Sequence, residues 1–197
     1  AASDVYKRQT FTYCQKLIFQ SSLAGLMVAP LLFLLVAGNL GGDLASAIDP
    51  LMISIAFSSK AGQAVLVLFL GFLLVSLWSY LLPKQLWTIV LAGFSCILIS
   101  FSVYGHSTIN GYTSQLLIVL HLLAISYWVG SFFPLRYSTY RDIEDEKLFQ
   151  IAHKFGIYAV YYILVLLVAG VSLGTILVGS LNGLLYSTYG QVFLLKL

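Results

Sequence analysis

The stretch QLLIVLHLLAISYWVGSFFPL, residues 115–135, decides the fold of this chain. A membrane-spanning α-helix needs about 20 mainly apolar residues, and this stretch supplies them without any Asp, Glu, Lys or Arg. His121 lies about seven residues inside the predicted helix, which corresponds to a depth of ~10 Å. An ionisable side chain at that depth is costly and is by default a functional candidate. The stretch therefore predicts a spanning helix that carries a functional histidine.

The composition identifies the lipid bilayer as the main solvent of the chain. Hydrophobic residues make up 60% of the sequence and charged residues 9%, with a mean hydropathy of +0.95, whereas soluble domains carry about a quarter charged residues. The net charge of +3 comes without a basic block, so no nucleic-acid partner is expected. Cys14 and Cys96 form no CxxC pattern, which argues against a disulfide framework. The sequence has no GxSxG, P-loop or HExxH motif, so we do not expect an enzyme.

The apolar runs predict an all-α, polytopic transmembrane bundle of five full helices and the start of a sixth. The predicted helices are 17–38, 61–82, 86–105, 115–135 and 154–179, and the sixth begins at 191. The apolar piece LMISIAF, between the first two helices, is too short to span a bilayer. The charged segment RYSTYRDIEDEKLFQ predicts a solvated loop or surface helix, and LNGLLYSTYG predicts a loop.

The sequence divides into a short leader and one transmembrane domain. Residues 1–9, AASDVYKRQ, lack the apolar core of a signal peptide and resemble a translated adapter, so we predict a non-native leader there. Residues 10–197 are predicted to form a single transmembrane domain that is truncated within its sixth helix.

Lysine and arginine residues are distributed unevenly between the two sides of the predicted bundle. Six of them fall on one side: Lys16, Lys84, Arg136, Arg141, Lys147 and Lys154. The other side holds Lys60 and, slightly inside the sixth helix, Lys196. Because positive residues accumulate in cytoplasmic loops, we expect a cytoplasmic N-terminus. His106 and His121 then lie toward the outer face.

Polar side chains recur at helical spacing on the predicted hairpin of helices 86–105 and 115–135. The first helix carries Ser95, Ser102 and His106, and the second carries Ser114, His121 and Trp128. Residues seven or four apart share one face of an α-helix. If the two faces meet, both histidines line one seam between the helices. Alternatively, a neutral histidine bonds a serine or a backbone carbonyl across a helix pair and is purely structural.

The chain has few other side chains that could bind a metal. Imidazole suits copper, zinc and iron, whereas thioether and thiolate groups select Cu(I). Outside the histidines, the soft donors that we consider are Met27, Met52 and Cys96. A single methionine or cysteine on an apolar helix is usually a packing residue. We therefore treat these three, with Ser102 and Trp128, as supporting candidates beside the histidines.

Two segments resemble the CopD family of copper-resistance membrane proteins. The first is GHS followed by a loop and HLLAISYWVG, with an apolar tail that ends at Pro134-Leu135, and the second is YSTYGQVFLLKL. The residues that match the family pattern are His106, His121, Trp128, Gly130, Tyr189, Gly190 and Lys196. In organisation the likeness covers residues 40–197.

The resemblance implies an inner-membrane protein of about eight helices that handles copper ion. It implies that copper moves inward from the periplasm, with His106 and His121 as its ligands and a periplasmic copper-binding protein as a partner. Lys196 is expected to be functional or to reach the outer headgroups.

Two other functions are compatible with the same residues. A membrane electron carrier would bind haem between two facing histidines, and the three histidines of this chain could serve one haem at most. An assembly or scaffold protein would use the histidines only to hold helices together. Absorbance in the Soret region separates haem from the other functions. Metal analysis with and without His121 separates transport from a scaffold.

A short motif, Ser-x-x-Gly-Gln, occurs at the predicted starts of the second and sixth helices, at 59–63 and 187–191. Parallel internal repeats occur in some transporters. The motif therefore indicates either an internal repeat or a chance match.

Overall fold

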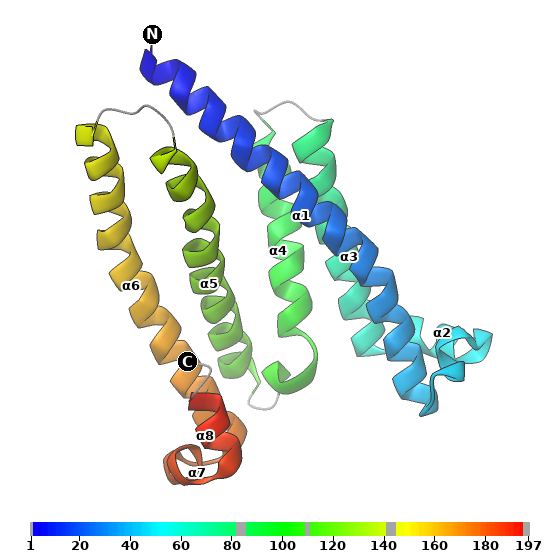
Figure 1. The fold of residues 1–197 in the computed structure, drawn as a ribbon. Coiled ribbons are helices and arrows are strands. Elements are labelled where there is room, and N and C mark those ends of the chain that lie inside the picture. Colours follow the sequence, from blue (N-terminus) through cyan, green and yellow to red (C-terminus); the bar gives the residue numbers. More distant parts are fainter. Residues whose placement is uncertain (1, 82–85, 109–110, 141–144, 195–197) are drawn as a thin grey trace. The chain divides into compact units, whose positions relative to one another are not determined.

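The computed structural model describes residues 2–81, 86–108, 111–140 and 145–194, and these form eight α-helices and two 3₁₀ helices without a strand (Figure 1). The predicted all-α fold is confirmed. The chain divides into two compact units. One unit is residues 15–105, and the other joins residues 1–14 to residues 106–197. We call them the 15–105 unit and the 106–197 unit and describe each by itself.

The 15–105 unit contains most of the long first helix and the four elements that follow it. These are α1 (Ala2–Gly41), η1 (Ala45–Ile48), α2 (Pro50–Ser58), α3 (Lys60–Tyr80) and α4 (Trp87–Ser102). The predicted first helix, 17–38, was too short, because no proline or glycine before Gly25 stops the helix on its N-terminal side. Gly42 follows its C-terminal end with φ +85°, a conformation that favours glycine.

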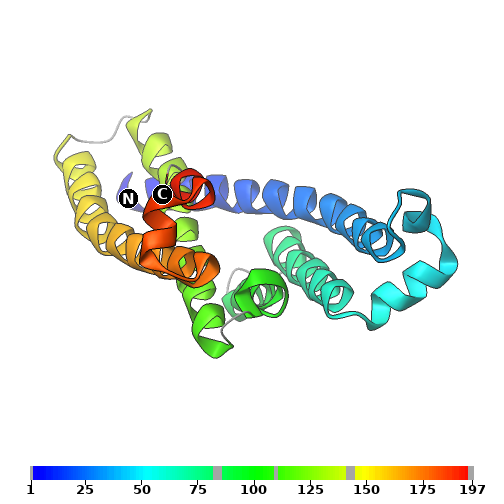
Figure 2. The same ribbon diagram turned by 90° about the horizontal axis from the view of Figure 1, so that it is seen from below.

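Two glycines set the contact between α3 and α4, which lie side by side (Figures 1 and 2). A Cβ atom added to Gly71 would lie 2.7 Å from the carbonyl oxygen of Gly93. A Cβ atom added to Gly93 would lie 2.8 Å from the carbonyl oxygen of Gly71. Each glycine therefore lets the other helix's backbone approach closely, as small residues do in membrane helix pairs.

The third predicted helix, 86–105, is shorter in the structure. α4 ends at Ser102, and His106 lies in a separate 3₁₀ turn, η2 (Gly105–Thr108). Gly105 has φ +81°, in the left-handed region that glycine enters readily and that interrupts an α-helix. The expectation that Ser95, Ser102 and His106 share one continuous helical face was therefore wrong at His106.

The 106–197 unit is built on a long helical hairpin. Its helices are α5 (Tyr112–Thr139), α6 (Asp145–Val178), α7 (Leu181–Tyr186) and α8 (Thr188–Leu194). α5 and α6 are neighbours, and the rings of Tyr127 and Tyr162 stack between them with centroids 3.8 Å apart. α6 includes the second part of the charged segment, which was predicted as a solvated loop or surface helix and is helical from Asp145 onward.

The predicted loop at 181–190 was wrong, because two serines cap short helices there. Ser180 accepts a hydrogen bond from the Gly183 amide at 2.9 Å, at the start of α7. Ser187 accepts one from the Gly190 amide at 3.0 Å, at the start of α8. A serine side chain in this position satisfies an amide that the helix leaves free.

Among the described residues, four helical segments are long and apolar enough to cross a membrane. They are Arg8–Gly41, Lys60–Tyr80, Tyr112–Thr139 and Leu148–Val178. The 16 residues of α4 rise only about 24 Å at 1.5 Å per residue, which is less than the ~30 Å hydrocarbon core. α2, with 9 residues, is too short to span, as predicted.

Candidate functional site

One face of α5 carries two buried polar atoms that have no partner in the part of the chain that the structure describes. Ser114 is 0% exposed, and neither its Oγ nor the buried Nδ1 of His121 has a hydrogen-bond partner among the described residues. The two residues are seven positions apart, so they lie on the same side of the helix. An unpartnered buried polar group costs about 1–3 kcal/mol. A polar ligand or ion that bonded these atoms would remove this cost, so this face of α5 is a candidate site.

The predicted partner of His121 falls outside what the structure describes at the side-chain level. His106 is placed by its backbone in η2, in the same unit as His121, but its side chain lies outside the described residues. The pairing of His106 with His121 therefore stays a prediction. Lys196 also lies outside the described residues.

Trp128 shares the helical face of His121 by spacing but makes an aromatic contact of its own. Its ring packs edge-on against Phe132 with centroids 5.7 Å apart, and 41% of the residue is exposed. This arrangement agrees with packing at the helix surface and adds no polar atom to the site.

The serine, methionine and cysteine candidates belong to the 15–105 unit, whereas His121 and Trp128 belong to the other. The Ser102 hydroxyl donates to the Ile99 carbonyl of its own helix at 2.9 Å. Met27 is 66% exposed, Met52 is half-buried beside Gly41, and Cys96 is a half-buried free thiol. Within the described parts of the chain, no three His, Cys, Asp or Glu side chains form a group that could hold a metal.

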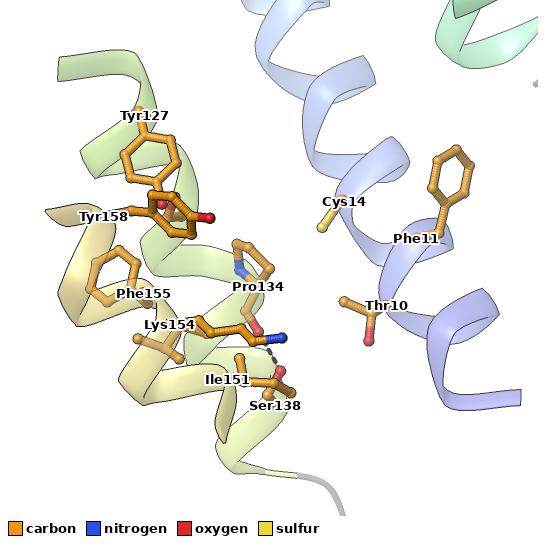
Figure 3. Close-up of a pocket in the computed structure, with 12 residues that line it drawn as sticks. Thr10, Phe11, Cys14, Tyr127, Pro134, Ser138, Ile151, Lys154, Phe155 and Tyr158 are labelled. Atoms are coloured by element: carbon orange, nitrogen blue, oxygen red, sulfur yellow. Dashed lines mark hydrogen bonds between the residues drawn. The ribbon is translucent and has the colours of Figure 1, made fainter. Parts of the chain in front are cut away.

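The sequence reasoning missed a cavity of about 570 Å³ in the 106–197 unit (Figure 3). The N-terminal part of α1, the C-terminal half of α5 and the first half of α6 surround it. Its lining includes Cys14, Tyr127, Pro134, Lys154, Phe155 and Tyr158. The tyrosines crowded near the start of the fifth predicted helix were the available signal, but no periodicity in the sequence brings residues 10–14 to them.

Comparison with known protein families identifies the chain. Residues 1–115 match the family described as copper resistance protein D-like, N-terminal domain. The matched part contains His106, Met27, Met52 and Cys96 and ends before His121. No curated protein and no solved structure matches the chain.

The matched segment covers more than half of the sequence, and four described helices are long and apolar enough to cross a membrane. The chain is therefore a multi-pass membrane protein that belongs to the copper resistance protein D-like family.

Proposed function

We propose that this protein is a copper permease of the bacterial inner membrane that takes copper from the periplasmic side inward, with His121 as a ligand on the path. The observation that carries the proposal is the buried Nδ1 of His121, which has no partner among the described residues although it lies on a spanning helix. Membership of a copper-resistance family supports copper as the cargo.

The chemistry of the α5 face suits transient metal binding. A neutral imidazole is a good copper ligand, and the Ser114 hydroxyl on the same face is a second polar group that lacks a partner in the described structure. His106, in η2, would supply the second imidazole. A path that must also release its cargo needs binding that is favourable but not strong, which a site of few ligands provides. A periplasmic copper-binding protein would deliver the ion.

Histidine substitutions test the site directly. His106→Ala and His121→Ala should each remove most copper uptake into cells, and the double variant should be little worse, because two ligands of one site are not additive. His153→Ala is the matched control, since His153 is exposed on α6 and stacks on Phe149 at 5.9 Å. Uptake should weaken in acid, because metal ligands must be deprotonated. Small additive losses with normal copper content would make both histidines structural.

The proposed orientation has a separate test. Thr108 precedes α5 and Thr139 ends it, and both are exposed. Each is changed to cysteine in a Cys14→Ser, Cys96→Ser background and labelled from outside with an impermeant thiol reagent. A cytoplasmic N-terminus requires labelling at position 108 and none at position 139. The opposite pattern would invert the topology and the direction of uptake.

A further inference from the structure

The cavity of the 106–197 unit is distinct from the His121 face and has an apolar wall with one charged corner. Aromatic rings of Tyr127, Phe155 and Tyr158 and the ring of Pro134 form much of the wall. Figure 3 shows the Lys154 side chain extending from α6 toward the side of the cavity formed by α1. The volume of about 570 Å³ falls within the range of ligand sites, which are mainly apolar with a few polar groups.

The charged corner is not neutralised by the described parts of the protein. Lys154 is exposed and has no acidic partner among the described residues. The carboxylate of Glu146, two turns earlier on α6, accepts a hydrogen bond from the Gln150 amide at 3.2 Å. The Thr10 hydroxyl, also in the lining, is buried without a partner in the described structure. An anionic group with acceptor oxygens would satisfy both the amine and this hydroxyl.

We propose that this cavity holds an anionic membrane phospholipid, with its phosphate at the Lys154 amine and an acyl chain along Pro134, Phe155 and Tyr158. The occupant follows from charge complementarity and from location. The walls come from spanning helices, which contact lipid on every unpacked face. Basic pockets between such helices bind anionic headgroups, while the apolar wall suits a chain. Binding of this lipid does not depend on copper binding at His121.

Lipid titration of the full-length protein tests whether the charge of Lys154 contributes to lipid binding. Phosphatidylglycerol or phosphatidylcholine is added to the protein in detergent, and bound lipid is counted by native mass spectrometry. Phosphatidylglycerol should bind more tightly, and Lys154→Gln should weaken it about fivefold, the effect of one basic residue near the membrane surface. Arg136→Gln is the control, because Arg136 lies at the same end of the hairpin, over the Tyr140 ring at 5.7 Å, outside the lining. Equal binding of both lipids, or unchanged binding by Lys154→Gln, overturns the proposal.

Cys14 locates the lipid, because its thiol lines the same cavity. In a Cys96→Ser background, phosphatidylglycerol should slow alkylation of Cys14, and Lys154→Gln should require about five times more lipid for the same protection. Ser131→Phe fills the cavity without changing charge and should reduce phosphatidylglycerol binding even if Cys14 reacts too slowly to follow. Normal binding by Ser131→Phe, or alkylation of Cys14 at the same measurable rate with and without lipid, places the lipid elsewhere and overturns the proposal.

Discussion

Two helix pairs of this protein are packed through different contacts: α3 with α4, and α5 with α6. In the first pair, Gly71 and Gly93 bring the two backbones together. In the second, the rings of Tyr127 and Tyr162 stack between the two helices. Gly130 on α5 and Gly156 on α6 have no such role, because a Cβ atom on either would meet nothing within 4 Å.

The buried polar groups follow the same division. In an apolar segment of 18 residues within α3, 44% of the residues are buried, whereas 6% are buried in the corresponding segment of α5. Ser79 on α3 and Ser100 on α4 are buried, and each hydroxyl donates to a carbonyl of its own helix. On α5, Ser114 and His121 keep polar atoms that are buried and unpartnered in the described structure. The buried hydroxyls of Ser79 and Ser100 in the first pair are therefore bonded, whereas the α5 side of the second pair carries buried polar atoms that lack a partner among the described residues.

The largest change in stability should come from replacing a glycine by alanine in the first pair, and the same replacement in the second pair is its control. Gly71→Ala would place a methyl group 2.7 Å from the Gly93 carbonyl oxygen, and a backbone atom cannot move aside cheaply. We expect a loss of about 3 kcal/mol in the free energy of unfolding, the upper end for overpacking. Gly156→Ala should be neutral or stabilise by up to about 1 kcal/mol, because alanine is the better helix former. Thermal unfolding in detergent measures both, and equal effects would mean that α3 and α4 are not in close contact.

The second prediction compares buried serines. Ser114→Ala removes a hydroxyl that has no partner among the described residues, so it should stabilise the protein by about 1 kcal/mol while it reduces copper uptake. Ser100→Ala removes a hydroxyl that donates to the Ile97 carbonyl at 2.6 Å. It should cost about 0.5–1 kcal/mol and leave uptake unchanged. Destabilisation by Ser114→Ala would show that its hydroxyl has a partner in the folded protein.

Helix identity was predictable from the sequence, while helix ends depended on single residues. The apolar runs located α3 and α5 to within a few residues, because about 20 apolar residues have no other stable arrangement in a bilayer. The C-terminal end of α4 was predicted three residues too late. The apolar run continues to Gly105, but α4 ends at Ser102 and Gly105, with its positive φ, begins the separate turn η2. Hydropathy does not encode this conformation.

The candidate site was predictable only in part. His121 stands out in sequence because an imidazole lies in an apolar run; the structure adds that its Nδ1 is buried without a partner among the described residues, and its role as a ligand stays a prediction. Ser114 was named only for its spacing, and nothing in the sequence shows that it is fully buried. The cavity beside Lys154 depends on tertiary contact between α1 and the α5–α6 hairpin, and helical periodicity carries no information about such contacts.

The third prediction concerns the repeated serine motif, which has the same local structure in each unit. Ser59 accepts a hydrogen bond from the Gly62 amide, and Ser187 accepts one from the Gly190 amide, both at 3.0 Å. Ser59→Ala should cost about 1 kcal/mol in global unfolding, the usual value of an N-cap, because it starts the well-buried α3. Ser187→Ala should instead speed only local amide exchange in α8. Equal global losses would favour an internal structural repeat over a recurrent capping motif.

The smallest effect should be the coupling between Tyr127 and Tyr162, because much of the energy of a stacked pair is ordinary burial. The rings are 3.8 Å apart at 14°, and aromatic pairs add about 0.5–1.5 kcal/mol beyond their buried area. We expect about 0.5 kcal/mol, since neither residue is fully buried and surrounding lipid competes for the ring faces. A double-mutant cycle of Tyr127→Leu and Tyr162→Leu isolates this energy, because leucine keeps an apolar side chain on each helix. Coupling of the size expected for Gly71 would make the stack as essential as the glycine contact, and the contrast between the two pairs would then lie only in the polar groups on α5.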